Sequence, residues 1–402
     1  MAKENDGQTL RDYGNRKKRY RRRRNGIIYF LLFVIVVIGI VYLFRLYNKS
    51  YQGYEVMNSE PNKGENTSGY LSYGSAVIKY SKDGAVAIDN SGSLLWNGSY
   101  EMMDPIAETC GKYVVIADRG NKLVHIYNGK GAVGSITTQY NITKAVVSAQ
   151  GVVAVLMEDG EANYIKLYYT QSNIGADNED DMLVDMKKDV NTEGYPMDIA
   201  LSEDGEKLII SFLMVNTGKL ESTIGFWNFG EVGQNYTDGF TGGFNYPDIV
   251  IPRVTFLNND VACVYKDNGF MLYSMMEIPK LIYQEDFDRK IKSVIHDKKF
   301  TGVVLEGDES TPKQILLYDL KGKKVLDKQL NFDYDKIFLA GDEIVMYDNL
   351  SCLILKTNGK EKFRYTFDGN IAAFYPINNL DHYFFINASE ISEILLVESK
   401  NK

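Results

Sequence analysis

A short pattern at the end of a strand-like segment recurs eight times along this chain and limits the possible folds strongly. Each copy is marked by an apolar or aromatic residue shortly before a turn or polar segment: Ile88, Tyr127, Tyr169, Trp227, Tyr273, Tyr318, Leu355 and Val397. Successive marks lie 39, 42, 58, 46, 45, 37 and 42 residues apart. Four-stranded propeller blades repeat every ~40 to 50 residues. The pattern therefore predicts an all-β fold, a β-propeller of eight blades, with seven as the alternative.

The segments between these marks support the same fold. They are runs of Val, Ile, Leu, Tyr and Phe bounded by Gly, Asn and Asp turns, without a sustained helical period. Residues 73–92 align without a gap with residues 340–359. One unit contains four strand-like runs in order, at 291–297, 300–307, 314–320 and 324–330. Neighbouring blades would cover both faces of each such sheet, and closing the ring would remove its exposed edges.

An apolar segment near the N-terminus predicts a membrane span. The nineteen residues from Gly26 to Phe44 are uncharged, and as a helix they match the ~30 Å thickness of the hydrocarbon layer. Eight basic residues precede it: Arg16, Lys17, Lys18, Arg19, Arg21, Arg22, Arg23 and Arg24. Only Arg45 and Lys49 follow closely, so this charge asymmetry should hold the N-terminus in the cytoplasm.

The expected organisation is therefore that of a single-pass cell-membrane protein with its C-terminal domain outside. Its parts are a basic cytoplasmic tail (1–25), a transmembrane helix (26–46), a juxtamembrane stalk (47–68) and a propeller ectodomain (69–402). Residues 1–25 carry ten basic and three acidic groups, which leaves 35 basic and 50 acidic groups beyond them. A domain with a net charge of −15 makes a nucleic-acid partner improbable, because neutralising phosphates requires a basic face.

Two other interpretations of the N-terminal region are less economical. A cleaved signal has an apolar stretch of ~7 to 15 residues and a small-x-small site, and the exit sequence IVYLFRLYNKSYQG contains no such site. The basic run also resembles a nuclear or nucleic-acid signal. Beside an apolar span, a role in setting topology explains the same charges, and attraction to anionic headgroups of the lipid bilayer would add to it.

The two ends of the ectodomain are expected to pair. The eighth unit supplies three strand-like runs, at 371–377, 382–388 and 393–399, so that its fourth strand is missing. Residues 51–57 alternate in polarity and have no other explanation. We therefore predict that they pair with 393–399 as the outer strand of the last blade.

Motifs for chemistry are weak. The string GxGxxG at 129–134 joins two strand-like runs and is expected to be a hairpin, because a dinucleotide site would require a helix to follow it. His125, His296 and His382 lie in three different units without a second ligand at metal spacing, and Cys110, Cys263 and Cys352 are expected to be buried thiols rather than a disulfide framework. The acidic loop Asp177, Glu179, Asp180 and Asp181 lacks the alternating ligands of a calcium loop. No cofactor, metal or catalytic residue is therefore predicted.

One aromatic stretch is a candidate partner-binding site. Residues 228–250 contain five aromatic residues among five glycines: Phe229, Tyr236, Phe240, Phe244 and Tyr246. Aromatic rings on a propeller loop stack on sugars or hold peptides, whereas the alternative is that they pack between blades.

The segments SGSLLW (91–96) and IALSEDGEKLIISF (199–212) resemble repeats of quinoprotein-like propellers. Together with the basic tail and the anchor, the chain resembles an uncharacterised family of Gram-positive single-pass propeller proteins, a resemblance that implies a fold and a location but no activity. The favoured function is a non-enzymatic binding or scaffold module for envelope proteins or glycans. The alternatives are a quinoprotein-like oxidoreductase or hydrolase with a site in the central channel, or a ligand-sensing ectodomain. Clustered carboxylates, Lys and His in a deep channel pocket would favour catalysis.

Overall fold

The computed structural model describes residues 2–62, 67–170, 182–216, 218–308, 310–378 and 380–398. The chain divides into two compact units, Met1–Ser50 and Tyr51–Lys402, and each is described by itself.

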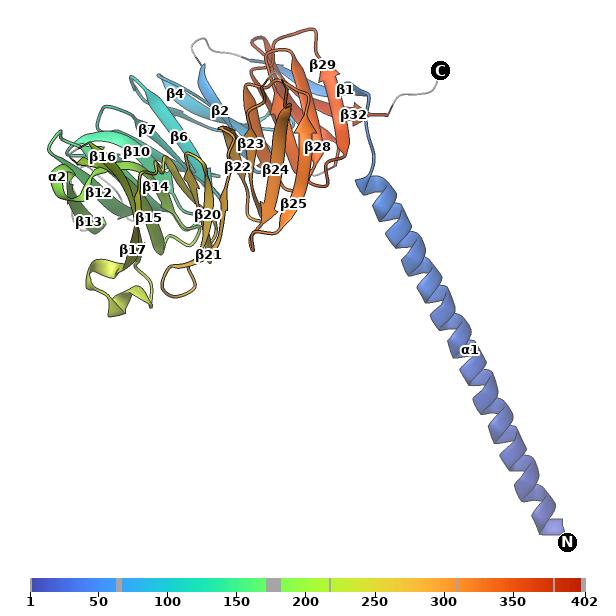
Figure 1. Ribbon diagram of the computed structural model, residues 1–402. Helices are drawn as coiled ribbons and strands as arrows, with labels where there is room; N and C mark the ends of the chain where they lie inside the picture. Colours follow the sequence, from blue (N-terminus) through green and yellow to red (C-terminus); the bar gives the residue numbers. More distant parts are fainter. Residues whose placement is uncertain are drawn as a thin grey trace. The chain divides into compact units, whose positions relative to one another are not determined.

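The first unit is one long helix, α1 (Ala2–Tyr47), shown in blue in Figure 1. Within it, Arg24–Tyr42 has a mean hydropathy of 2.5, and none of its residues is buried inside the protein. Among the described helices, only this segment is long and apolar enough to cross a membrane. The length and composition agree with a signal anchor, and a signal sequence meets the same criteria. The eight predicted topology residues all lie on α1, immediately before the apolar segment or at its start.

The second unit is an eight-bladed β-propeller made of eight four-stranded antiparallel sheets, as predicted. Blades 1 to 3 are β2 (Thr67–Tyr73), β3 (Ala76–Ser81), β4 (Gly84–Asp89), β5 (Leu94–Ser99); β6 (Pro105–Cys110), β7 (Tyr113–Asp118), β8 (Leu123–Asn128), β9 (Gly131–Thr137); and β10 (Asn141–Val147), β11 (Val152–Glu158), β12 (Ala162–Tyr169), β13 (Met182–Asp189). Blades 4 and 5 are β14 (Tyr195–Leu201), β15 (Lys207–Asn216), β16 (Lys219–Asn228), β17 (Phe240–Pro247); and β18 (Arg253–Asn258), β19 (Val261–Lys266), β20 (Gly269–Ser274), β21 (Lys280–Asp286).

Blades 6 to 8 are β22 (Ile291–His296), β23 (Phe300–Leu305), β24 (Lys313–Asp319), β25 (Lys324–Leu330); β26 (Lys336–Ala340), β27 (Glu343–Tyr347), β28 (Ser351–Lys356), β29 (Glu361–Thr366); and β30 (Ala373–Pro376), β31 (His382–Ile386), β32 (Glu390–Val397), β1 (Gly53–Pro61). Three short helices occur in loops: α2 (Val190–Glu193), η2 (Gly233–Asn235) and η3 (Thr237–Gly239).

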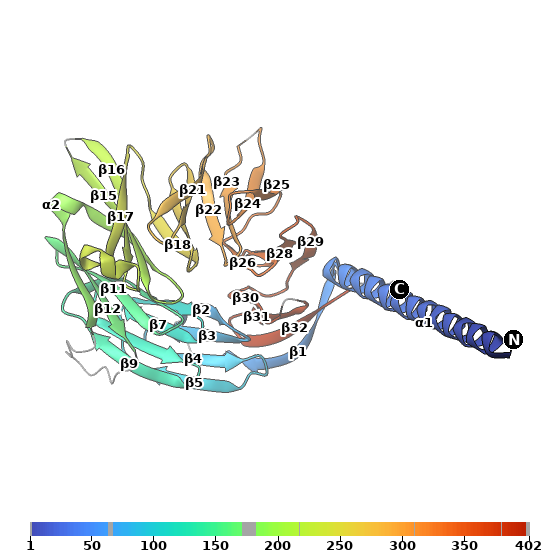
Figure 2. The ribbon, with the colours of Figure 1, turned by 90° about the horizontal axis from the view of Figure 1, so that it is seen from below.

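The blades are arranged in a ring, which Figure 2 shows from below. The first strands of neighbouring blades contact each other, as β10, β14 and β18 do, so the first strand of each blade is the innermost. The core lies between adjacent sheets: one buried cluster, for example, packs Leu156 of blade 3 against Leu208 of blade 4. Each blade therefore depends on its neighbours for burial of its faces.

The predicted repeat has a structural cause. Its eight marking residues all lie at or near the end of the third strand of their blades, on β4, β8, β12, β16, β20, β24, β28 and β32. In blades 1 to 7 the pairing between the third and fourth strands slips at this position or beside it, which is a β-bulge. The following turns in blades 1, 6 and 7 use Gly92, Gly322 and Gly359, whose φ angles of 82°, 80° and 83° favour glycine.

The predicted pairing of the two ends is confirmed. β1 lies antiparallel to β32, with Gly53 opposite Val397 and Pro61 opposite Glu390. The Tyr54 ring lies 5.2 Å from Tyr365 and 5.1 Å from Phe367. β1 also extends four residues beyond the predicted strand. Much of residues 47–68, predicted as a stalk, therefore belongs to the last blade.

Candidate functional site

The structure separates the five candidate aromatic residues into three environments. Phe244 and Tyr246 on β17 pack into the seam between blades 4 and 5, where the Tyr246 hydroxyl hydrogen-bonds to that of Tyr273. Phe229 packs against the buried cluster between blades 3 and 4. Tyr236 and Phe240 remain 40% and 42% exposed. Three of the five rings therefore pack between blades, which was the alternative expectation, and the two exposed rings can contact a partner.

Phe240 lies in a groove between the outer strand of blade 3 and the sheet of blade 4, which we call the outer groove. It encloses about 1020 Å³ between β13 and strands β15 to β17. The aromatic lining comprises Phe212, Trp227, Phe229 and Phe240, and the polar lining includes Asp185, Lys187, Lys188, Thr192, Glu193, Thr223, Thr237, Asp238 and Asn245. Phe240 stands edge-on to Trp227 at 5.2 Å. The groove thus combines apolar ring surface with donors and acceptors of both charges.

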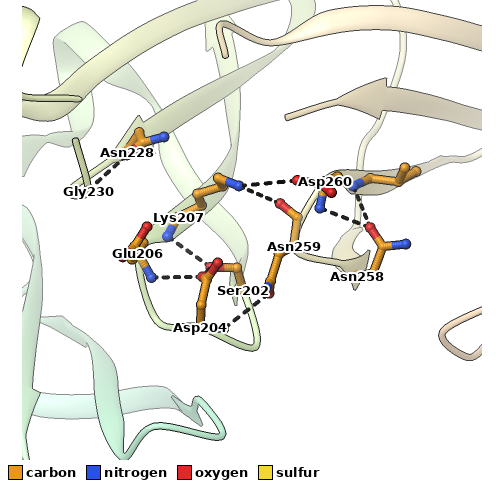
Figure 3. Close-up of polar contacts among 10 residues, drawn as sticks. Ser202, Asp204, Glu206, Lys207, Asn228, Gly230, Asn258, Asn259 and Asp260 are labelled. Carbon is orange, nitrogen blue, oxygen red and sulfur yellow. Dashed lines mark hydrogen bonds and ion pairs between the residues drawn. The ribbon is translucent and has the colours of Figure 1, made fainter. Parts of the chain in front are cut away.

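Polar contacts join the turn at residues 202–207 of blade 4 to the turn at residues 258–260 of blade 5 (Figure 3). Blade 4 also carries the aromatic loop, which begins after Asn228. Lys207 Nζ donates to the carbonyl of Asn259 at 2.7 Å, and Asp204 N donates to Asn259 Oδ1 at 3.1 Å, which joins blades 4 and 5. Asn228 Oδ1 accepts from Gly230 N at 2.9 Å, and Phe229 N donates to the carbonyl of Glu206 at 2.7 Å. The start of the aromatic loop is therefore fixed to its blade.

A second hollow lies on the inner side of the ring, and we call it the channel cavity. It encloses about 440 Å³, and residues from the inner strands β6, β10, β14, β18 and β22 line it. The charged and titratable lining residues are Glu108, Cys110, Lys144, Glu203, Arg253, His296, Asp297 and Lys298. Five blades thus bring ionisable groups together at one place.

Several of these groups are paired within the protein. Lys144 Nζ lies 2.5 Å from Asp198 Oδ1 and donates to the carbonyl of Ile199 at 3.0 Å. The other oxygen of Asp198 accepts from Val254 N at 2.9 Å, which joins blades 3, 4 and 5. Lys298 Nζ lies 2.6 Å from Glu203 Oε1. These pairs compensate much of the charge along the wall.

The pKa values of Glu108 and His296 are shifted from their ordinary values. Burial raises the pKa of Glu108 from 4.5 to about 7; Lys144 and Arg253 oppose this rise, whereas Asp198 adds to it. Burial, together with the positive charges of Arg253 and Lys144, lowers the pKa of His296 to about 4. At neutral pH the imidazole is therefore uncharged, and the Glu108 carboxyl exchanges between its two forms.

The other two histidines singled out from the sequence lie apart from the channel cavity and from each other. His125 stacks on Tyr100 at 5.4 Å, whereas His382 Nδ1 lies 2.7 Å from Glu393 Oε1. Within the described residues, no group of three His, Cys, Asp or Glu is arranged to hold a metal ion.

The cysteines and the remaining motifs have separate places. Cys263 and Cys352 are buried free thiols, and Cys110 is half-buried at the channel cavity. Residues 129–134 form the predicted hairpin between β8 and β9. Asp177, Glu179, Asp180 and Asp181 lie outside the described residues.

Of the residues that line the channel cavity, His296 and Cys110 were singled out from the sequence, whereas Glu108, Lys144 and Arg253 were not. Glu108, Lys144 and Asp198 each occupy the fourth position of the first strand of their blades. Aligning the first strands of the units and searching for charges in them would have found these three residues.

Residues 47–396 match a protein family described as "Family of unknown function (DUF5711)". No curated protein gives a significant match. Among solved structures, the chain is similar to BamB from Moraxella catarrhalis, with 12% identity, a TM-score of 0.52 and coverage of 86% of this chain and 100% of that one. A structure titled "Crystal structure of the eukaryotic initiation factor" gives 13% identity, a TM-score of 0.50 and coverage of 87% and 88%. At these identities the likeness establishes the propeller fold alone.

Proposed function

This chain belongs to the DUF5711 family of unknown function, and we propose that it is a membrane-anchored binding module of the cell envelope. In this proposal the propeller lies outside the cytoplasm and docks a protein or a glycan without catalysing a reaction. The apolar segment Arg24–Tyr42 and the basic residues that precede it support the location, because basic residues beside a span stay in the cytoplasm.

The outer groove carries the binding part of the proposal. Its volume of about 1020 Å³ accommodates several sugar rings or an extended peptide. Phe240 offers an exposed ring, and Asp185, Lys187, Asp238 and Asn245 offer polar groups around it. Rings flanked by hydrogen-bonding side chains are the usual composition of interface hot spots.

The channel cavity gives less support to the enzyme alternative than its composition suggests. Lys144 is held by Asp198, so its ammonium is not a free nucleophile. Burial raises the pKa of the Cys110 thiol to about 11, so this sulfur is protonated at neutral pH. A lowered pKa is one way in which a thiol is activated as a nucleophile, and the pKa of Cys110 is raised instead.

The proposal is tested by gentle solubilisation of membranes that contain the full chain, followed by purification and analysis of co-purifying proteins and bound cell-wall glycans. We compare the wild type with Phe240→Ser and with Leu94→Ser, a control on β5 whose side chain is 59% exposed outside the groove. Loss of a central aromatic contact should weaken capture at least about tenfold in Phe240→Ser and leave Leu94→Ser unchanged. Equal capture by all three proteins, or no specific capture by the wild type, would contradict the proposal.

A further inference from the structure

Some polar side chains of the channel cavity have no ion pair within the part of the protein that the structure describes and can therefore bind a ligand. The Asp198 carboxylate accepts from both Lys144 and Val254 N, and Glu203 is paired with Lys298. The Arg253 guanidinium has five N–H donors. Its contact with another side chain is a 3.5 Å approach of Nη2 to His296 Nε2, at the limit of hydrogen bonding. Among the described residues, Arg253 has no carboxylate at ion-pair distance.

Glu108 is a second side chain that can form a hydrogen bond to a ligand. It lies on β6 in blade 2 and lines the same cavity as Arg253, which lies on β18 in blade 5. Within the described part of the chain, its carboxyl group has no hydrogen-bonding partner. The positive charges of Lys144 and Arg253 both act on this carboxyl group. A protonated Glu108 has a hydroxyl that can donate a hydrogen bond, as an ionised one cannot.

The balance of charge indicates the kind of ligand. The Lys144–Asp198 pair is neutral as a unit, and Glu203 and Lys298 compensate each other. His296 is uncharged at neutral pH. Asp297 and Glu108 add carboxyl groups to the lining, but neither lies at ion-pair distance from Arg253, whose guanidinium therefore remains able to bind an anion. A planar guanidinium fork matches the two oxygens of a carboxylate.

We propose that the channel cavity is a binding site for a small carboxylate, held by the Arg253 guanidinium, with Glu108 and His296 as additional polar contacts. The volume of about 440 Å³ suits a small molecule, because small-molecule sites typically span ~300 to 1,000 Å³. The site is separate from the outer groove, and it does not depend on the function proposed for that groove.

The geometry also predicts the pH dependence of binding. Neutral Glu108 donates to the bound carboxylate, whereas ionised Glu108 repels it, so affinity should fall as pH rises through the titration of this group, near pH 7. The other groups around it change little between pH 6 and 8: His296 remains neutral and Cys110 remains protonated. The charged residues on the surrounding elements are Lys144, Asp198, Glu203, Arg253, Asp297 and Lys298.

The experiment uses the full chain in detergent micelles and isotope-labelled acetate, whose binding is measured by NMR at constant ionic strength. Acetate should bind specifically at pH 6 and several-fold more weakly at pH 8. Arg253→Gln should weaken binding at least about tenfold, since hydrogen bonds to charged groups contribute strongly, and Arg253→Lys should keep part of it. Glu108→Gln should bind without the pH dependence. Arg364→Gln serves as a control, because this arginine lies on β29 and pairs with Glu361 outside the cavity.

Several outcomes would overturn the proposal. They are no acetate binding at any pH, equal weakening by Arg253→Gln and Arg364→Gln, or binding of methylammonium in place of acetate. Binding of inorganic phosphate without acetate would reject the carboxylate class. Because Arg253→Gln also removes a contact with His296, its melting temperature is measured, and Arg253→Lys provides the comparison if the glutamine variant does not fold.

Discussion

Removing β1 should destabilise the propeller without changing any other strand. The comparison is between a form that begins at Tyr51, where the compact unit starts, and one that begins at Asn62, just after β1. The shorter form loses Tyr51, which is 7% exposed, and Tyr54, which packs on three aromatic rings. Asn62 and its contact with Lys79 remain.

The expected loss can be estimated from these two side chains. Burying a large apolar side chain contributes ~1.5 to 3 kcal/mol, and a close aromatic pair adds ~0.5 to 1.5 kcal/mol. Two tyrosines and three ring contacts therefore contribute about 5 to 10 kcal/mol. With an unfolding entropy of ~2.1 cal/mol/K per residue, a domain of about 350 residues should lose roughly 6 to 14 °C in melting temperature.

Calorimetry measures this difference, and amide hydrogen exchange measures the protection of residues 53–61. Tyr54→Ala alone should lower the melting temperature by about 3 °C. Met57→Ala is its control, because Met57 lies on the same strand with its side chain 50% exposed. Equal melting of the two truncated forms, or exchange in 53–61 as fast as in a free chain, would refute the closure of the ring by β1.

Three further predictions concern side chains elsewhere in the propeller. Glu108→Gln should stabilise the protein by about 1 to 2 kcal/mol at pH 8 and not at pH 4. The reason is that the pKa of Glu108 is about 7 in the folded protein and 4.5 in the unfolded chain, so the ionised carboxyl group lowers the stability of the fold as pH rises through this window. Unchanged pH dependence in urea unfolding would contradict this. Phe244→Ser should cost about 2 to 3 kcal/mol and Phe240→Ser less than about 1 kcal/mol, because Phe244 lies between blades and Phe240 is exposed; equal losses of stability would refute the assignment. Glu343→Ala should cost about 3 to 5 kcal/mol in chemical unfolding, because it leaves Lys356 and Lys362 buried without their carboxylate, and a loss below about 1 kcal/mol would show that the cluster is dispensable.

The number of blades was predictable because one local feature repeats in the sequence. Tyr127, Tyr273 and Tyr318 each precede the end of a third strand, where the bulge and turn impose similar requirements on every blade. The pairing of β1 followed from counting strands, since the last unit lacked one. Its length did not follow, because residues 58–61 are polar and their pairing is set by the exposed edge of β32.

The candidate sites were harder to predict because they are assembled across blades. Glu108 and Arg253 are distant in sequence and come together only when five inner strands surround the channel. Phe240 and Phe244 look alike in the sequence, and strict alternation would place two residues four apart on the same face of a strand. The pairing of β17 slips between them, so that Phe240 is exposed and Phe244 packs between sheets. Local composition identified the aromatic segment, but burial in the ring determines which of its rings are available.

The central claim, a propeller held outside the cytoplasm by an uncleaved helix, is tested most directly by reporter topology with the full chain. A reporter fused after Lys402 should be active only outside the membrane, and one fused at residue 2 should be active only in the cytoplasm, on a protein that keeps residues 1–45. A C-terminal reporter active in the cytoplasm would contradict the account. So would a mature protein that begins after residue 45, because the apolar segment would then be a cleaved signal.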